Sequence, residues 1–366
     1  MNNNLLGFGC MRLPMHGDAV DTVEFSRMID AYLEAGFNYF DTAHVYLDGK
    51  SETALRECLI SRYPREKYVL TDKISECFQT EADLRPYFDT MLEACGVEYF
   101  DYLLLHNQNS RNYDKYTRCR AYEFAQQMKA EGKVRHVGIS FHDTPEFLER
   151  ILREHPEIEI VQIQFNYVDY ENPAVESRRC YEVCRKYGKP VLVMEPVKGG
   201  SLTKLPAAAQ QVFDELHGGS AASYAIRFAA GFEGMFKVLS GMSDMAQMEE
   251  NIGFMGNFQP LNEQEQAAVE QVREIFRTQD IIPCTACRYC TSGCPQQIAI
   301  PDLFACYNSK KQYMDWGCGH RYKKLTENGG KPADCVQCGQ CEEACPQNLK
   351  IRALLQTVAK EFEKMK

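Results

Sequence analysis

Short apolar segments alternate with amphipathic stretches over the first 257 residues of the chain. Eight of the apolar segments have the length and boundaries expected of strands. We predict these strands at Leu5–Gly9, Phe37–Asp41, Lys67–Lys73, Phe100–His106, Val134–Ser140, Ile160–Gln164, Pro190–Met194 and Phe236–Ser240. Eight strands that alternate with helices over about 250 residues predict an α/β fold of the (β/α)8 TIM-barrel type.

The stretches between the predicted strands have the periodicity of helices. Thr22–Glu34 places its apolar residues near one face, and so does Asp244–Phe254. Ser51–Ile60 predicts another helix, in which Ser51 is the expected N-cap. Glycines fall where helices stop before the next strand, at Gly36, Gly96, Gly132 and Gly188.

An open, doubly wound sheet is the alternative fold for such a pattern. That fold would normally show G-x-G-x-x-G after an early strand. Gly7 and Gly9 form only a fragment of this motif, and no third glycine follows at the right place. We interpret these two glycines as a tight approach of backbone at the mouth of a barrel.

The last quarter of the chain repeats one cysteine pattern, C-x2-C-x2-C-x3-C followed by proline. Its eight cysteines are Cys284, Cys287, Cys290 and Cys294, and then Cys335, Cys338, Cys341 and Cys345. The spacing suits two [4Fe–4S] clusters, because each short loop wraps three sulfurs around one corner of a cube. The fourth cysteine, before the proline, usually ligates the other cluster of the pair. The pattern resembles that of a bacterial two-cluster ferredoxin.

Zinc ribbons and disulfides are the other uses of closely spaced cysteines. Zinc sites usually take C-x2-C pairs, which three evenly spaced cysteines followed by C-P do not match. We therefore predict a barrel at residues 1–257, a helical linker at 258–282 and a ferredoxin-like α+β iron–sulfur domain at 283–366. The linker contains a predicted helix, Glu263–Thr278, capped by Asn262, and the last domain ends in a helix at Ala353–Lys366.

The 17 cysteines of this 366-residue chain would suggest disulfides only if it were secreted. The N-terminus lacks a basic start followed by an apolar core, and no apolar run approaches membrane-spanning length. We therefore expect a cytoplasmic setting, in which free thiols need no partners. The cysteines outside the repeats are expected to be buried or idle: Cys10, Cys58, Cys77, Cys95, Cys119, Cys180, Cys184, Cys306 and Cys318.

The net charge of −10 argues against a nucleic-acid partner, because phosphate contacts need a basic surface. From residue 283 onward, however, 12 Lys and Arg stand against 8 Asp and Glu. This local excess would balance the negative charge of thiolate-ligated clusters. Between the cysteine sets, Trp316 is expected to pack over the clusters, whereas Cys306, Cys318 and His320 are either extra ligands or bystanders.

Ionisable residues follow three successive predicted strands of the barrel. The second strand offers Asp41 and Tyr46, the third offers Lys73, and the fourth offers His106. Active sites of barrels lie at these C-terminal strand ends. Any one of the four residues alone is compatible with a structural role, but four at neighbouring strand ends point to catalysis.

This arrangement resembles the aldo-keto reductase family, in which an Asp, a Tyr in D-T-A-x-x-Y, a Lys and a His form a catalytic tetrad. Gly138-Ile139-Ser140, Gln162–Asn166 and Asn251 also match, and with the cysteine repeats the chain is similar to the branch bearing a ferredoxin-like extension. The resemblance implies reduction of a small carbonyl compound with NADP(H) or NAD(H). It implies cofactor contacts from Gly9, Met11, Ser140, Gln164, Met194, Lys198, Gly241, Gln247 and Asn251, with Gly199 and Gly200 as further candidates beside the pyrophosphate.

The four residues suit proton donation to a developing oxyanion. A tyrosine has a reference pKa of about 10, which a nearby ammonium lowers by stabilising tyrosinate. Lys73 is expected to have this effect on Tyr46, and Asp41 is expected to hold Lys73 charged and oriented. His106 would donate a hydrogen bond to the substrate oxygen or relay a proton.

Several positions depart from the family pattern. Phe141 follows Gly-Ile-Ser where Asn is usual, and Met194 stands where an aromatic usually stacks on the nicotinamide. Gly241 and Gln247 replace the Lys and Arg that usually hold the 2′-phosphate of NADP. Losing both cations removes charge-assisted bonds to the phosphate, so we expect selectivity for NADP over NAD to be weak or reversed.

Three functions are compatible with the sequence. The barrel could be a carbonyl reductase braced by the clusters, the clusters could carry electrons between a redox partner protein and the barrel cofactor, or the barrel could sense the cofactor without turnover. A hydride carries two electrons whereas a cluster accepts one, and no convincing flavin motif would connect them. The complete tetrad favours the enzyme, with no nucleic-acid and no membrane partner.

Overall fold

The computed structural model of the protein describes residues 4–172, 175–278, 280–313, 318–327 and 329–363. Eight parallel strands form a closed barrel in the order β1-β10-β9-β8-β7-β6-β5-β4. They are β1 Leu6–Gly9, β4 Tyr39–Asp41, β5 Val69–Ile74, β6 Phe100–Gln108, β7 Val134–Phe141, β8 Ile160–Gln164, β9 Val191–Met194 and β10 Met235–Ser240. The predicted TIM barrel is confirmed, and each predicted strand end lies within two residues of the observed one.

Alternation along the strands decides which side chains reach the barrel interior, because successive residues face opposite sides. One buried interior layer is formed by Tyr39, Leu104, Ile160, Leu192 and Leu239. Asp41 lies two positions after Tyr39, and His106 lies two positions after Leu104. Both therefore face the interior, one layer closer to the C-terminal ends of the strands.

Glycines make room in this interior layer. A Cβ atom on Gly138 would lie 2.5 Å from Cγ2 of Ile160, and one on Gly7 would lie 2.7 Å from Cδ2 of Leu239. At Gly9 the nearest atom would be 3.5 Å away, which is an ordinary contact. The prediction of a close backbone approach at the barrel mouth is therefore wrong in its location. The close approach occurs at Gly7, beside the buried interior layer.

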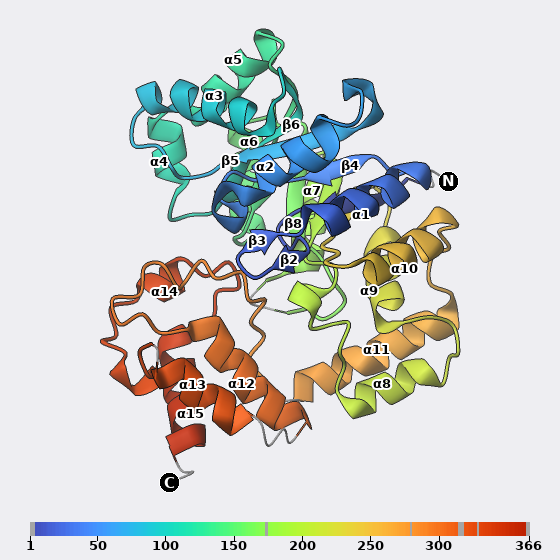
Figure 1. Ribbon diagram of the computed structural model, residues 1–366, viewed down its shortest axis with the longest axis vertical. Coiled ribbons are helices and arrows are strands. Elements are labelled where there is room, and N and C mark those ends of the chain that lie inside the picture. The colour runs from blue at the N-terminus through green and yellow to red at the C-terminus, as the bar shows by residue number, and fades with distance from the viewer. Residues whose placement is uncertain (1–3, 173–174, 279, 314–317, 328, 364–366) are drawn as a thin grey trace. The chain divides into compact units, whose positions relative to one another are not determined.

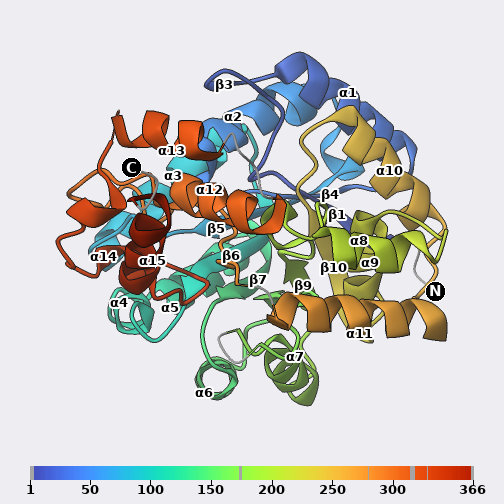
Figure 2. The same ribbon diagram turned by 90° about the horizontal axis from the view of Figure 1, so that it is seen from below.

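Helices cover the outside of the barrel (Figures 1 and 2). They are α1 Thr22–Glu34, α2 Lys50–Leu55, α3 Leu84–Cys95, α4 Tyr113–Arg118, α5 Ala121–Ala130, α6 Pro145–Glu154, α7 Ser177–Lys186, α9 Ala221–Ala230 and α10 Met245–Gly256. A short hairpin, β2 Met15–His16 and β3 Ala19–Val20, follows β1. The predicted helices at Thr22–Glu34 and Asp244–Phe254 are confirmed as α1 and α10, with Asp244 as the N-cap of α10.

The prediction of Ser51 as an N-cap is wrong. The residue that precedes α2 is Gly49, and Ser51 lies inside the helix. Its buried hydroxyl donates to the carbonyl oxygen of Cys10 at 2.9 Å, so the side chain faces the barrel and not the helix end. The predicted helix continues after α2 as a single π-helical turn at Arg56–Ile60.

The described residues divide into two compact units. The first comprises the chain up to Asn172, Glu176–Pro196 and Ala222–Asn262, and it contains the barrel strands. The second comprises Val197–Ala221 and the chain from Glu263 onward. The segment Val197–Ala221 thus groups with the cysteine-rich part, although it follows a barrel strand in sequence.

The second unit is helical. Its helices are α8 Ala207–Asp214, α11 Glu263–Thr278, α12 Ile300–Tyr313, α13 Cys318–Glu327, α14 Gln340–Glu343 and α15 Ile351–Glu363. Helices α12, α13 and α15 pack together, and α8 lies beside α11 (Figure 1). The predicted helix Glu263–Thr278 is confirmed as α11. Across the described ranges, no helix has the length and apolarity that crossing a membrane would require.

Candidate active site and cysteine sets

The four candidate catalytic residues lie together at the C-terminal ends of the barrel strands. Asp41 ends β4, Lys73 lies near the end of β5, and His106 lies near the end of β6. Tyr46 begins a 3-10 turn, Tyr46–Gly49, that follows β4. Its ring meets the imidazole of His106 edge to face, with 5.9 Å between the ring centroids.

Lys73 is fully buried, and each of its ammonium hydrogens has an acceptor. Its Nζ donates to Asp41 Oδ1 at 2.6 Å, to the carbonyl oxygen of Thr42 at 2.7 Å and to Tyr46 Oη at 3.2 Å. An ammonium has three donors, so these bonds fix its position completely. The structure thus brings Asp41, Tyr46 and Lys73 into one network, as the strand ends predicted.

The expected lowering of the Tyr46 pKa is wrong for this structure. Burial raises the pKa of the Tyr46 phenol well above its ordinary value of 10.0, and the negative charge of Asp41 raises it further. The physical reason is that Lys73 is already paired with Asp41 at 2.6 Å, so the phenol lies beside a pair of little net charge. Tyr46 is therefore a protonated phenol at neutral pH.

His106 is neutral at neutral pH. Its pKa is lowered well below 6.5 by burial and by the positive charge of Lys73. Ser75 Oγ lies 2.7 Å from Nδ1 of the ring. If Ser75 donates this bond, the single ring hydrogen sits on Nε2, where it is available as a donor.

Sequence reasoning missed Ser75, and it named Gln162 only as part of a matching motif, without a role in this network. Gln162 Nε2 donates to Asp41 Oδ2 at 3.2 Å, so that each oxygen of Asp41 has a donor. The alternation of side chains along the strand could have identified Gln162, because it lies two positions before the candidate Gln164 and therefore faces the same barrel interior. Ser75 lies two positions after Lys73 and could have been found in the same way.

Most of the candidate cofactor residues lie at the same end of the barrel. Ser140 lies in β7, and Gln164 and Met194 are paired in register at the ends of β8 and β9. Gly9 is the last residue of β1, and Gly241 comes directly after β10. Met11 is half-buried in the turn after β1. Gln164 already donates from Nε2 to Asp169 at 2.6 Å, so a contact with a carboxamide would have to share or replace this bond.

Helix α10 carries the last two candidates in the first unit. Asn251 is buried, and its Oδ1 has no donor among the residues that the structure describes. Such an orphaned acceptor fits the exocyclic amine of an adenine, as a dinucleotide would provide. Gln247 is exposed, and its amide is bound by Asp244 and by the backbone of Ser243.

Lys198 belongs to the second unit, in a 3-10 turn at Lys198–Gly200. The residue is buried, with only 3% of its surface exposed, whereas a lysine that binds a phosphate from solvent would be exposed. A Cβ atom on Gly199 would lie 2.4 Å from the carbonyl oxygen of Thr285, and its φ is +63°. Only glycine fits there, so this turn packs tightly on the first cysteine loop.

The first three cysteines of the repeat share a cavity with the last one. Cys284, Cys287, Cys290 and Cys345 line it together with apolar side chains that include Ile300 and Phe304. Burial raises the pKa of the Cys290 thiol, and the neighbouring Cys287, Cys284 and Cys345 raise it further. The backbone amide of Ala286 donates to Cys284 Sγ at 3.4 Å. Four converging sulfurs with an amide donor fit an iron–sulfur cluster.

The other set is assembled in the same way. Burial raises the pKa of Cys341 to about 11, with further contributions from Cys335 and Cys338. Gly293, which precedes Cys294, lies beside the side chain of Gln340, which precedes Cys341. This arrangement suits Cys335, Cys338, Cys341 and Cys294 as the ligands of a second cluster.

The remaining candidates of the C-terminal part are placed as follows. Cys306 and Cys318 are buried in the hydrophobic core of the second unit, beside residues such as Leu303 and Tyr307. Trp316 and the side chain of His320 lie outside the described residues.

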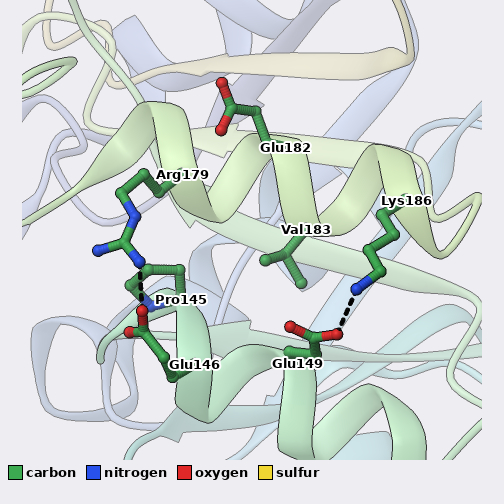
Figure 3. Close-up of a pocket in the computed structure, with 7 residues that line it drawn as sticks. All are labelled: Pro145, Glu146, Glu149, Arg179, Glu182, Val183 and Lys186. Atoms are coloured by element: carbon green, nitrogen blue, oxygen red, sulfur yellow. Dashed lines mark hydrogen bonds and ion pairs between the residues drawn. The ribbon is translucent and has the colours of Figure 1, made fainter.

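A groove between α6 and α7 lies on the outer surface of the barrel (Figure 3). Arg179 pairs with Glu146, and Lys186 pairs with Glu149 at 2.5 Å, so both cations are neutralised within the groove. None of the seven residues that line it is at a strand end. It therefore takes no part in the candidate active site.

Known proteins are similar to this chain over the barrel. An aldo-keto reductase of Mycolicibacterium smegmatis is 28% identical over 227 residues, covering 61% of this chain and 74% of that protein. L-galactose dehydrogenase of Arabidopsis thaliana is 24% identical over 291 residues, covering 74% and 90%. Among solved structures, an aldo-keto reductase from Klebsiella pneumoniae in complex with NADPH is similar in fold, with a TM-score of 0.60, 18% identity and coverage of 74% and 90%.

Two family models divide the chain between them. The 4Fe-4S dicluster domain matches residues 283–349, which contain both cysteine sets. The aldo/keto reductase family matches residues 5–274, which contain all barrel strands and the network around Lys73. As its resemblance predicted, the chain belongs to the aldo/keto reductase family.

Proposed function

We propose that the protein is an NAD(P)H-dependent oxidoreductase that reduces the carbonyl group of a small molecule at the C-terminal end of its barrel. Bound nicotinamide supplies the hydride that the carbonyl carbon receives. Tyr46 gives its proton to the carbonyl oxygen, so that hydride and proton together convert the carbonyl into an alcohol. The NADPH complex of the structural relative from Klebsiella pneumoniae supports the choice of cofactor.

The hydrogen bonds of Lys73 are the observation that carries this proposal. Because Tyr46 Oη accepts a bond from Lys73, its own hydrogen points elsewhere and is available to a substrate oxygen. Burial keeps this phenol protonated before the reaction. Once the proton has left, the ammonium at 3.2 Å stabilises the tyrosinate, so the interaction is strongest when charge has developed.

His106 is the proposed second donor to the substrate oxygen. A neutral imidazole donates a hydrogen bond without surrendering its proton, and the low pKa of His106 keeps it neutral. Around the cofactor, Ser140 and Gln164 are the proposed partners of the carboxamide, Met194 packs on the nicotinamide ring, and Asn251 binds the adenine. Gly9 and Gly241 allow close approach of the chain to the dinucleotide.

The decisive test is Tyr46→Phe in the full-length protein, purified without oxygen. We expect oxidation of NADPH or NADH in the presence of aldehydes and ketones to fall by about 10² or more, since general-acid catalysis contributes that much. Iron and sulfide content should not change. Tyr32→Phe is the matched control, because it removes a buried phenol hydroxyl that donates to the carbonyl oxygen of Leu6, on the outside of the barrel.

The result separates the alternatives. Cofactor binding without turnover of any carbonyl compound by the unmodified protein would indicate a sensing module. Turnover that survives Tyr46→Phe would refute the proposed role of Tyr46. The two cysteine sets are proposed to hold two [4Fe–4S] clusters, which predicts about eight irons per chain.

A further inference from the structure

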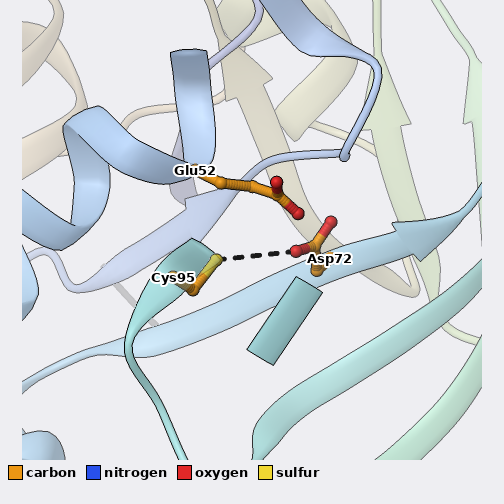
Figure 4. Close-up of side chains that lie close together, drawn as sticks. All are labelled: Glu52, Asp72 and Cys95. Atoms are coloured by element: carbon orange, nitrogen blue, oxygen red, sulfur yellow. Dashed lines mark hydrogen bonds between the residues drawn. The ribbon is translucent and has the colours of Figure 1, made fainter. Parts of the chain in front are cut away.

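Two buried carboxyl groups face each other on the outer side of strand β5, directly behind the proposed active site. Glu52 comes from α2 and Asp72 from β5, and neither is exposed to solvent. Figure 4 shows their carboxyl groups pointing toward one another, with the thiol of Cys95 beside them. One oxygen of each carboxyl group and the sulfur of Cys95 lie within 4.8 Å of one another.

The donors around this pair do not satisfy all of its oxygens. Glu52 Oε2 lies 2.8 Å from His44 Nδ1, and Asp72 Oδ2 lies 3.6 Å from Cys95 Sγ. Glu52 Oε1 is buried and has no donor within the described part of the chain. Two buried carboxyl acceptors that face each other require something positive between them, and a single proton meets that need.

The pair is connected to Lys73 along two short routes. The backbone amide of Lys73 donates to Asp72 Oδ1 at 2.7 Å. Ser51, which adjoins Glu52, lies 2.7 Å from Thr42 through the two hydroxyl groups, and the carbonyl oxygen of Thr42 accepts from Lys73 Nζ at 2.7 Å. Asp72 therefore binds the backbone of Lys73 directly. Glu52 is next in sequence to Ser51, which contacts Thr42, and Thr42 accepts a hydrogen bond from the Lys73 ammonium.

The titratable groups that face the pair come from every element around it. They are Lys73 on β5, His44 and Tyr46 after β4, and Cys95 and Tyr87 on α3. Lys73 is the only lysine or arginine among these groups, and its charge is matched by Asp41. Burial raises the pKa of Glu52 to about 7, and burial together with the charge of Glu52 raises the pKa of Asp72 well above its ordinary range.

We propose that Glu52 and Asp72 share one proton and act together as positioning residues for Lys73. With the proton in place, the pair holds the Lys73 segment of β5 in the position that lets its ammonium reach Asp41 and Tyr46. When the proton leaves to solvent, two buried carboxylates repel each other and this segment shifts. The proposal deepens the proposed reductase function and rests on it for its effect on catalysis.

The shared proton can be observed without any assay of activity. Infrared spectra of the full-length protein at about pH 6, where ordinary carboxyl groups with a pKa of about 4 are ionised, should show the stretching band of a protonated carboxyl group. The band should disappear as the pH rises. Glu52→Gln and Asp72→Asn should each abolish it at this pH, because the new amide donates to the remaining carboxylate.

Two variants serve as controls for the infrared band. Cys95→Ala leaves both carboxyl groups and should retain the band. Asp101→Asn removes another buried carboxylate, which is paired with Arg65 and Arg135, and should retain it as well. A band contributed by Asp41 would survive both Glu52→Gln and Asp72→Asn, which distinguishes that source.

The positioning role is tested by the pH profile of carbonyl reduction. The unmodified protein should lose kcat on the alkaline side in parallel with the infrared band, whereas Asp72→Asn and Glu52→Gln should flatten that limb. Asp72→Ala, which lacks the acceptor for the Lys73 amide, should lower kcat by about tenfold or more with little change in KM, and Asp72→Asn should restore it.

Two results would overturn the inference. One is the absence of a protonated-carboxyl band in the unmodified protein, and the other is an equimolar metal ion, beyond the iron of the clusters, that Glu52→Gln removes. If the band behaves as expected but Lys73→Met retains carbonyl reduction, the shared proton stands and the proposed reductase mechanism fails.

Discussion

His106 is a single residue whose ionisation should be visible in the stability of the whole protein. Its folded pKa is lowered well below 6.5, so between that value and 6.5 the unfolded chain binds a proton that the folded protein does not. The free energy of unfolding should therefore fall as the pH drops below about 6.5. His106→Gln should weaken this dependence, as measured by denaturant unfolding between about pH 5 and 7.

An imidazole at the surface provides the control for that experiment. His16 is exposed in the β2–β3 hairpin, and His16→Gln controls for the removal of an imidazole as such. An unchanged slope in His106→Gln would contradict the buried, neutral state assigned to this ring.

We expect the choice between NADP and NAD to depend on single residues as well. Gln247 is held by Asp244, so the position offers a fixed amide beside a carboxylate where a 2′-phosphate would need a cation. Gln247→Arg combined with Gly241→Lys should tighten NADPH relative to NADH by about tenfold or more, because a hydrogen bond to a charged group is worth about 1.5–3 kcal/mol. Isothermal titration of both dinucleotides measures the ratio.

A matched arginine elsewhere tests whether added charge alone explains such a gain. Gln210 also donates its amide to an aspartate, Asp214, on helix α8, and Gln210→Arg should leave the ratio of affinities unchanged. If the unmodified protein already binds NADPH clearly more tightly than NADH, the expected loss of selectivity is wrong.

Sequence reasoning at this scale succeeded where chemistry follows strand position and failed where it depends on pairing. Asp41, Lys73 and His106 could be found because barrel strands end at one face. The ionisation of Tyr46 could not, since it depends on how closely Asp41 neutralises Lys73. The pair of Glu52 and Asp72 was missed because the spacing of these residues along the sequence does not indicate that a helix and a strand bring their carboxyl groups together.

At the scale of elements, the periodicity of apolar residues and the order of strands and helices along the chain predicted most of the fold. The alternation of strands and helices predicted every barrel strand, because a strand buried on both faces reads as a continuous apolar run. Ser51 shows the limit of such local signals. A serine near a helix start suggests a cap, but in α2 it faces the barrel and bonds to Cys10.

Each proposed cluster takes three cysteines from one repeat and the fourth cysteine from the other repeat. Double substitutions test this arrangement, because single substitutions do not show which cysteines serve the same cluster. Cys345 belongs to the second repeat in sequence but lines the cavity of Cys284, Cys287 and Cys290. Cys287→Ser and Cys345→Ser should each remove about four of eight irons, and so should the double variant, because both disable the same cluster. Combining Cys345→Ser with Cys338→Ser should remove nearly all iron.

Iron and sulfide analysis of proteins purified without oxygen provides the measurement. Cys306→Ala is the control, since Cys306 is buried in the core of the same unit and is not a member of either set. A greater loss of iron in Cys287→Ser combined with Cys345→Ser than in either single variant would contradict the shared cluster.

At the scale of the whole molecule, one chain joins a two-electron chemistry to a one-electron chemistry. A nicotinamide transfers a hydride, whereas a [4Fe–4S] cluster accepts a single electron, and a flavin usually converts between them. The sequence shows no convincing flavin motif. One hypothesis is that the clusters stabilise the C-terminal part and do not exchange electrons with the bound nicotinamide.

This hypothesis can be tested on the intact protein. NADPH added without oxygen should leave the visible absorption and the electron paramagnetic resonance signal of the clusters unchanged, with or without a carbonyl substrate, whereas dithionite should reduce them. The same sample should reduce an aldehyde, which shows that the barrel is active while the clusters stay oxidised. Bleaching by NADPH alone, at a rate that Tyr46→Phe does not change, would instead mean that electrons reach the clusters without passing through carbonyl chemistry. The clusters would then conduct electrons, and a one-electron partner protein would have to exist.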